Sequence, residues 1–242
     1  MIKAARKYPV LLASLVVILF IGAATAWLLR DGMALQPNRF SHQAFTKWLA
    51  ANPGEQREFA AFSAHLTQQG VSDAVPVWQL LRSDTKPHLL CRRPAFLLPP
   101  RENWANIVPV LRLVRDRIEP VVGQVEVVSS YRTLAFNGCV GGATQSRHLS
   151  FSAIDLIVPG QRDSRALFGK LCAIHTKIGS ETQFGLGAYF DPLTARPNTV
   201  GRFHVDVSGF RSWGYSKHAA SSGCRLLATT PAVAPSGPAA AR

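Results

Sequence analysis

A long uncharged run behind a basic N-terminus determines where the rest of this 242-residue chain can fold. Three basic side chains in MIKAARKY precede the run, and the 21 residues from Pro9 to Leu29 carry no charge. About 20 apolar residues in a helix can cross a bilayer, and basic residues before such a span stay in the cytoplasm. We therefore predict that residues 1–30 anchor the chain in the membrane and that the remainder lies outside the cytoplasm.

A cleaved signal peptide is the alternative interpretation of this segment, because Ala-Thr-Ala at 24–26 fits the small-residue cleavage pattern. The apolar run continues through Trp27 to Leu29, beyond that site and beyond the usual length of the apolar core of a signal peptide. We therefore favour an uncleaved, single-pass anchor in the inner membrane over a secreted protein. Both interpretations place the folded part in the periplasm or another extracytoplasmic space.

Export limits the partners and the chemistry of the cysteines. The net charge of +13 suits nucleic acid, an acidic membrane surface or an anionic cell wall, and export argues against nucleic acid. An even number of cysteines in an oxidising compartment predicts disulfides, and four cysteines allow three pairings. We favour Cys91 with Cys139 and Cys172 with Cys224, while the sequence leaves the connectivity open.

An extension at residues 31–100 follows the anchor. Its first part has apolar residues at helical spacing, and Gly70 ends this pattern. The expected buried stripe consists of Phe40, Ala44, Phe45, Trp48, Leu49, Phe59, Phe62 and Leu66. Five prolines between residues 71 and 101 predict an irregular segment on the surface of the domain, to which we assign no function.

Residues 101–226 show the pattern of an α+β domain. We expect helices at 104–118 and 165–178, strands at 124–130, 153–158 and 202–207, a glycine-containing loop at 131–146, and a strand or loop at 179–189. Pro120 and Gly123 are expected to stop the first of these helices. Strands separated by helices of unequal length favour a mostly antiparallel sheet flanked by helices. The Pro/Ala-rich tail, residues 227–242, is expected to be disordered.

Two predicted strands carry polar groups where apolar ones are expected. Asp155 lies inside AIDLIV, and a buried carboxylate is costly unless it is paired or binds a cation. In RFHVDV, the residues Arg202, His204 and Asp206 share one face. Neutral imidazoles of His148 and His204 with the Asp155 carboxylate would form a three-ligand zinc site with a fourth position for water. The alternative is an arginine partner for Asp155 and ordinary hydrogen-bonded histidines.

The string SSYRTLAFNGCVGGATQSRHLSFSAIDL resembles the signature of zinc D-Ala-D-Ala peptidases, which share their fold with the hedgehog signalling domain. Ser146, His148, Ala153 and Asp155 match the pattern S-x-H-x-x-G-x-A-x-D in register. Downstream, GLGAYF and GRFHVDVSGFRSWG resemble the third-ligand strand of the carboxypeptidase-like, extensin-type branch, with His204 as the ligand. The resemblance implies a hedgehog/DD-peptidase-like α+β fold over about residues 104–215 and a Zn²⁺ cofactor.

The chain departs from this family pattern at three positions. Phe151 replaces the motif glycine, and Ser130 replaces the glycine of S-G-Y-R. Gly201 stands where many relatives place an acidic general base. We expect Asp206 to be the first candidate for that base, because the strand period places it on the face of His204. Its alternative role is to orient that histidine.

The resemblance also implies roles outside the ligand set. Arg132 matches a family arginine that can pair with a peptide carboxylate or stabilise the oxyanion, and Ser146 is expected to help bind substrate. We interpret Arg202 as a solvated strand arginine. Glu181 and Asp191 are further candidates for the base.

Together these features predict an exported, membrane-tethered zinc metallopeptidase. Its expected substrates are peptidoglycan peptides, in which it would hydrolyse amide bonds of D-amino acids as a D-Ala-D-Ala carboxypeptidase or a cross-link endopeptidase. The metal would polarise the scissile carbonyl and generate a nucleophile from water at neutral pH. The alternative is a catalytically inactive zinc-containing domain that binds wall peptides or scaffolds a partner, because Gly201 replaces an expected acid.

Overall fold

The computed structural model describes residues 38–86, 90–196 and 198–229, so the predicted anchor and almost all of the predicted tail lie outside the described residues. The chain divides into two compact units, Met1–Ala44 and Phe45–Arg242. Within the described ranges, no helix combines the length and apolar character that crossing a membrane requires.

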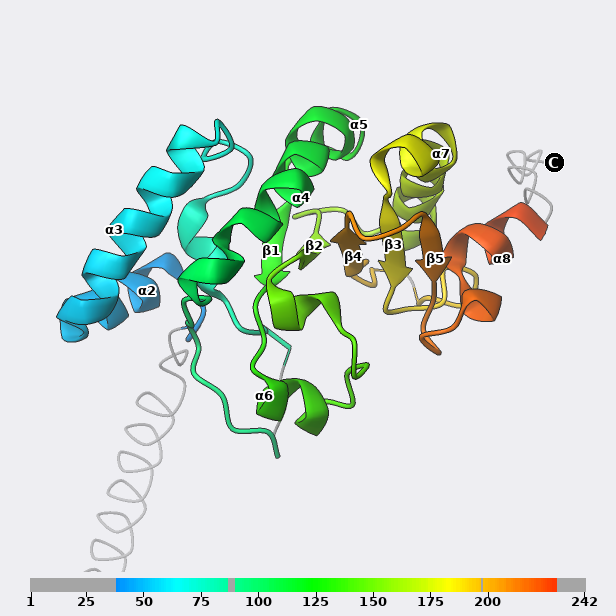
Figure 1. Ribbon diagram of the computed structural model, residues 1–242. Coiled ribbons are helices and arrows are strands. Elements are labelled where there is room, and N and C mark those ends of the chain that lie inside the picture. The colour runs from blue at the N-terminus through cyan, green and yellow to red at the C-terminus, as the bar shows by residue number, and fades with distance from the viewer. Residues whose placement is uncertain (1–37, 87–89, 197, 230–242) are drawn as a thin grey trace, which may run out of the picture. The chain divides into compact units, whose positions relative to one another are not determined.

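A five-stranded sheet forms the centre of the second unit (Figure 1). Its strands are β1 (Glu126–Ser129), β2 (Ala153–Ile157), β3 (Gly185–Ala188), β4 (Phe203–Asp206) and β5 (Arg211–Trp213), in the order β1-β2-β4-β3-β5. Neighbouring strands are antiparallel except β3 and β5, which are parallel. The predicted α+β class with a mostly antiparallel sheet is therefore confirmed. Strand β5 was not predicted, because three residues are too few to show a period.

α-Helices and short 3₁₀ helices accompany the sheet (Figure 1). The α-helices are α2 (His42–Ala51), α3 (Pro53–Gln68), α4 (Val108–Leu113), α5 (Glu119–Val122), α6 (Leu134–Cys139), α7 (Ser164–Thr182) and α8 (Gly223–Thr229). The 3₁₀ turns are η1 (Val77–Leu81), η2 (Arg101–Ile107), η4 (Arg147–Ser150) and η5 (Ala219–Ser221). Short helix α6 lies in the segment expected to be a loop, and α8 was not predicted.

The helix predicted at 104–118 forms, but its hydrogen bonding changes along its length. Turn η2 continues into α4, then into a π-helical turn, η3 (Val114–Ile118), and finally into α5. Pro120 lies in the first turn of α5 and does not stop the helix, which ends at Gly123 with a φ of 90°. A proline ring clashes with the carbonyl four residues earlier, and the wider π turn before it relieves this clash.

The Pro-rich part of the extension is irregular outside η1 and the start of η2, but its predicted surface position is wrong at several places, most clearly at residues 79–84, which are all buried. This stretch lies beside β1, where the Ser130 N–H donates to the Arg82 carbonyl over 3.1 Å. Prolines predict irregular backbone but carry no information about burial. The second compact unit therefore contains both α3 and this segment together with the sheet.

Both favoured disulfides are confirmed. Cys91–Cys139 joins the Pro-rich segment to α6, and Cys172–Cys224 joins α7 to α8. All four cysteines of the chain are thereby paired. Such pairing is typical of an oxidising, extracytoplasmic compartment.

Candidate metal centre

One row of residues crosses all five strands and carries two of the three predicted ligands. Ser129 pairs with Asp155, Asp155 with His204, His204 with Gly187, and Gly187 with Trp213. Residues paired in register lie on the same face of a sheet. The strand pairing therefore brings Asp155 and His204 side by side although 49 positions separate them in the sequence.

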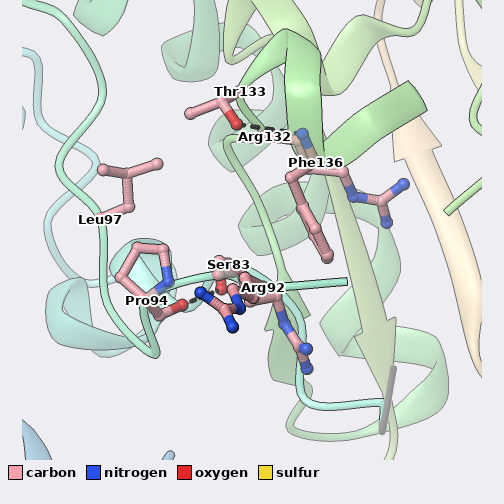
Figure 2. A pocket seen from close by; sticks show the side chains of 8 residues that line it. Ser83, Arg92, Pro94, Leu97, Arg132, Thr133 and Phe136 are labelled. Carbon is pink, nitrogen blue, oxygen red and sulfur yellow. Dashed lines mark hydrogen bonds between the residues drawn. The ribbon is translucent and has the colours of Figure 1, made fainter. Parts of the chain in front are cut away.

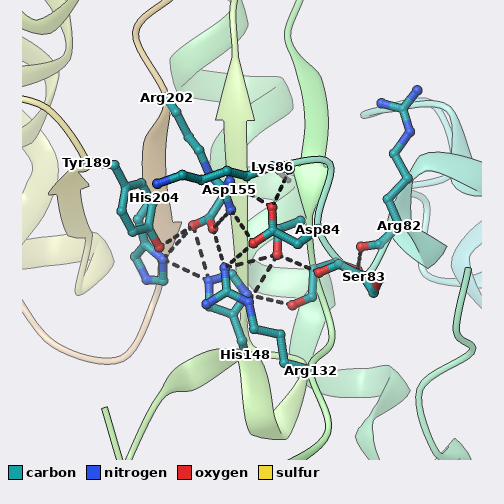
Figure 3. A network of polar contacts seen from close by, with 12 residues as sticks. Arg82, Ser83, Asp84, Lys86, Arg132, His148, Asp155, Tyr189, Arg202 and His204 are labelled. Atoms are coloured by element: carbon teal, nitrogen blue, oxygen red, sulfur yellow. Dashed lines mark hydrogen bonds and ion pairs between the residues drawn. The ribbon is translucent and has the colours of Figure 1, made fainter. Parts of the chain in front are cut away.

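His148 completes the group from η4, the turn that leads into β2 (Figure 3). Its Nε2 lies 3.1 Å from Asp155 Oδ1 and 3.2 Å from His204 Nδ1, and that Nδ1 lies 3.0 Å from the same carboxylate oxygen. Tetrahedral ligands at about 2.0–2.1 Å from a zinc ion lie about 3.3 Å apart. The three atoms are therefore spaced to hold one ion.

In each imidazole, the nitrogen that points away from the other ligands makes a hydrogen bond, and this bond determines which ring nitrogen carries the proton. His148 Nδ1 donates to the Ser130 carbonyl over 2.6 Å, and His204 Nε2 donates to Asp206 Oδ2 over 2.9 Å. In the neutral rings the other nitrogens then carry lone pairs, which face each other and Asp155 Oδ1. Three acceptor atoms therefore converge, and such an arrangement fits a cation.

The pKa values of the two histidines differ. Burial lowers the pKa of His148 to about 4, so this ring is a neutral donor of electrons to a metal near neutral pH. Burial alone would also lower the pKa of His204, but hydrogen bonds with Asp155 and Asp206 raise it. A proton on His204 and a bound metal would therefore compete for the same position.

The second oxygen of Asp155 faces two arginines. Its Oδ2 accepts from Arg132 Nη2 over 2.7 Å and from Arg202 Nη2 over 2.6 Å, while the Tyr189 hydroxyl donates to Oδ1 over 2.9 Å. Burial alone would raise the pKa of Asp155, but His148 and Arg202 hold it well below the usual carboxyl value. The group is therefore an ionised carboxylate with a fixed orientation.

Arg202 is not the solvated strand arginine that the sequence suggested, since its side chain is 15% exposed and bound within this cluster. Its guanidinium also donates to both oxygens of Asp84, over 2.8 and 3.1 Å (Figure 3). Burial alone would lower the pKa of Arg202, and Asp155 and Asp84 raise it. The prediction failed because the position just before β4 faces the same side as His204.

Asp84 was missed by sequence reasoning. It comes from the Pro-rich segment, is buried, and lies 3.5 Å from Arg132 Nη2 in addition to its bonds with Arg202. Its only signal in the sequence is the polar triplet RSD directly after the apolar pair LL. Two carboxylates, Asp84 and Asp155, thus balance the charges of the two arginines.

Asp206 lies in the next row of the sheet, paired with Gly185, which is itself paired with Arg211. Arg211 donates to both Asp206 oxygens, over 3.0 and 2.7 Å, and the Ser208 N–H donates to Oδ1 over 2.9 Å. Because Oδ2 binds His204 on the nitrogen that faces away from the other ligands, this geometry favours the orienting role over the role of base.

The sequence GLG in β3 makes room for the groups around His204. A Cβ atom at Gly185 would collide with the Asp206 carboxylate, and one at Gly187 would collide with the Trp213 ring. The Trp213 ring centre lies 5.3 Å from that of His204. Neither Gly187 nor Trp213 was assigned a role from the sequence, because only the pairing of β3 with β4 and β5 brings them to the site.

Three further residues predicted for the site, Asp191, Glu181 and Ser146, do not belong to the metal-ligand group. Asp191 Oδ1 accepts from the Leu193 N–H over 2.9 Å, which closes a turn after β3, and Glu181 is an exposed residue of α7. Ser146 directly precedes η4, and its hydroxyl has no hydrogen-bond partner in the described part of the chain. A Cβ atom at Gly201 would meet Ser164 and Leu167 of α7 and the Phe190 ring, none of which belongs to the metal-ligand group.

The comparisons with known proteins agree with this geometry. A model of the family Peptidase M15 matches residues 93–183, a range that includes His148 and Asp155 and ends before His204. No curated protein and no solved structure matches the chain. His148, Asp155 and His204 are the residues that could hold a metal ion in the described parts of the chain. Residues 93–183 are therefore similar to the Peptidase M15 family, and the structure completes the candidate metal-ligand group of His148, Asp155 and His204 beyond the end of that match.

Proposed function

We propose that this protein is an exported zinc peptidase that hydrolyses amide bonds of D-amino acids in peptidoglycan peptides, as a carboxypeptidase or a cross-link endopeptidase. The observation that carries the proposal is the convergence of two imidazole lone pairs and one carboxylate oxygen within 3.2 Å of one another, in a chain whose residues 93–183 match the Peptidase M15 family. Two nitrogen ligands and one oxygen ligand are typical of catalytic zinc sites.

Each residue of the cluster has a distinct task in this proposal. Bound to His148, Asp155 and His204, zinc would polarise the scissile carbonyl and lower the pKa of water enough for attack near neutral pH. Asp206 and the Ser130 carbonyl hold the two imidazoles in the required tautomers. Arg132 is the group available to the substrate, because its Nη1 has no partner among the described residues.

Proton transfer follows from the same contacts. Burial, followed by the neighbouring Asp155, raises the pKa of Tyr189, so its hydroxyl stays a donor at neutral pH. With Asp206 committed to His204, we propose Glu181 and Asp191 as the carboxylates to test as the base. Ser146, which directly precedes η4 and whose hydroxyl has no hydrogen-bond partner among the described residues, is the proposed polar contact for the substrate backbone.

The proposed setting is the extracytoplasmic face of the inner membrane. The uncharged run at residues 9–29 supports a single-pass anchor, and the two disulfides support an oxidising compartment. A net charge of +13 would keep the domain close to an anionic wall.

A domain that binds wall peptides without cleaving them is the second candidate, and Gly201 at the position of an expected acid favours it. The two candidates separate when full-length protein in detergent is incubated with purified muropeptides, with zinc or with chelator, and the products are weighed by mass spectrometry. We expect zinc-dependent loss of a terminal D-Ala or separation of cross-linked peptides. Muropeptides that stay intact while they bind the zinc-loaded protein would support the second candidate.

A further inference from the structure

Four buried charged side chains form a connected group beside the candidate metal ligands (Figure 3). Asp155 Oδ2 accepts from Arg132 and Arg202, and Arg202 also binds both oxygens of Asp84. Arg202 is the most exposed of the four, and its side chain is only 15% exposed. Two arginines are thus shared between Asp155, a candidate metal ligand, and Asp84, which is not one.

The backbone on both sides of Asp84 is bonded to the end of strand β1. The Thr85 N–H donates to the Val128 carbonyl over 2.8 Å. On the other side, the Ser129 hydroxyl donates to the Ser83 carbonyl, also over 2.8 Å. Asp84 therefore has a fixed backbone position from which its carboxylate reaches the arginines.

The two arginines differ in what else they can reach. Arg132 lines a pocket together with Ser83 (Figure 2), and its Nη1 has no partner among the described residues. Arg202 is not one of the described residues that line this pocket, and each of its Nη groups binds a carboxylate. Arg202 is therefore committed to bridging Asp84 and Asp155.

We propose that Asp84 is a positioning residue of the metal centre, which acts through Arg202 to keep Asp155 Oδ1 turned towards the two imidazoles. The terminal torsion of a carboxylate side chain has no sharply preferred angle, so the partners of each oxygen determine its orientation. Partners of this kind contribute strongly to metal affinity in other proteins. The inference rests on the proposed metal centre and extends it to a residue that precedes the family match at 93–183.

The test is the zinc affinity of full-length protein in detergent, measured by competition with a chromogenic chelator. For Asp84→Asn we expect the affinity to fall about 10- to 100-fold, because Arg202 loses its second charged anchor and a buried positive charge beside the metal is left uncompensated. Asp84→Glu keeps the negative charge and should stay within about 5-fold of wild type. The matched control is Glu126→Gln, which breaks an acid–arginine pair between the same segment and β1 and should change the affinity less than about 2-fold.

A second measurement separates positioning from a loss of stability or of charge alone. The visible absorption of cobalt-loaded protein depends on the geometry of the ligands, so it should change in Asp84→Asn and match wild type in Glu126→Gln. Circular dichroism checks that each variant is folded. If Asp84→Asn does not fold, Arg202→Lys takes its place with the same expected results, because an ammonium group cannot bridge two carboxylates as a planar guanidinium does.

The inference is overturned if the folded variant binds zinc as tightly as wild type, or if Glu126→Gln loses as much affinity. A fall in zinc affinity with an unchanged cobalt spectrum would show an effect of charge alone and would overturn it as well. Wild-type protein that binds no zinc would overturn it together with the metal centre. Hydrolysis of muropeptides is followed separately. Protein whose zinc binding depends on Asp84 but which cleaves nothing would contradict the proposed peptidase function and leave this inference standing.

Discussion

Asp155 shows why a strand of this domain contains a buried acid. One of its oxygens faces two imidazole nitrogens, and the other accepts from Arg132 and Arg202. A buried carboxylate that lost these partners would be strongly destabilising, and the two arginines would be equally unfavourable without it. The two interpretations that the sequence left open, a metal ligand and an arginine partner, therefore describe two different oxygens of the same side chain.

Excess zinc distinguishes the two possible roles of Asp206, which are to orient His204 and to act as the general base. For Asp206→Asn we expect zinc affinity to fall about 10- to 100-fold, because the amide orients His204 less well, and kcat to recover when zinc is saturating. Zinc affinity is measured by competition with a chromogenic chelator and kcat with a muropeptide. A kcat that stays about 10²- to 10⁴-fold low in saturating zinc would instead assign the base to Asp206.

Asp84 is expected to stabilise the folded chain through the two arginines. Asp84→Asn leaves Arg202 and Arg132 short of a buried negative charge, which should lower the free energy of unfolding by about 2–4 kcal/mol at neutral pH. Urea denaturation measures this change. The control is Glu58→Gln, which breaks an exposed pair with Arg101 and should leave the denaturation midpoint nearly unchanged.

Asp84→Asn should also change how stability depends on pH, in a direction that the lowered pKa of Asp84 determines. Burial alone would raise the pKa of Asp84, but Arg202 and Arg132 lower it. A carboxyl with a lowered folded pKa stabilises the protein above its unfolded value, about 3.9, and this contribution disappears as the pH falls through the folded value. The stability difference between wild type and Asp84→Asn should therefore be full above about pH 5 and shrink below about pH 4. A difference that grows in acid would show that the carboxylate is not held by the arginines.

At the scale of elements, two residues that depart from the family pattern contact the extension. Phe151, in place of a glycine, is fully buried with its ring centre 5.8 Å from that of Phe62 in α3. Ser130, in place of the other glycine, donates its hydroxyl hydrogen to the Leu80 carbonyl in η1. Its own carbonyl meanwhile accepts from His148. These departures thus join α3 and η1 to the strand and turn that position the metal ligands.

Phe151 combines a favourable side chain with an unfavourable backbone. Its φ of 55° lies in the left-handed region, which costs a residue other than glycine about 1–2 kcal/mol. Loss of the buried ring costs about 3–5 kcal/mol. Phe151→Gly should therefore lower the free energy of unfolding by about 1–4 kcal/mol, measured by urea denaturation.

The control for this prediction is Gln183→Gly. Gln183 has the same φ of 55° but is exposed at the end of α7, so its replacement relieves strain without emptying a core position. We expect little change or a small gain in stability. If Phe151→Gly were as stable as wild type, the contact between Phe151 and α3 would contribute nothing beyond its backbone cost.

At the scale of the whole molecule, local pattern and long-range contact account for different parts of the result. Hydrophobic periodicity and turn residues were sufficient to predict β2, β4 and α7. The family pattern in and around the two strands was sufficient to identify His148, Asp155 and His204 as candidate ligands. Short elements such as β5 and α6 have too few residues to show a period. Asp84 and Trp213 reach the site only through tertiary pairing, which no local pattern encodes.

The second compact unit depends on all of these parts together. The segment before the family match supplies Asp84 and the backbone partners of β1, and the segment after it supplies His204, Asp206 and Arg202. Truncation at the limits of the match, residues 93–183, would remove one predicted metal ligand and leave Asp155 without one of its arginines. The functional unit is therefore larger than the region that the family model recognises.

The metal content of purified full-length protein tests the central claim most directly. We predict close to one zinc per chain by atomic emission in the wild type and in His218→Ala, which changes an exposed histidine, and almost none in His148→Ala, Asp155→Ala or His204→Ala. Each of the last three removes one of the three ligands that the described part of the chain offers. Stoichiometric zinc retained in all three of these variants would contradict the assignment of the site.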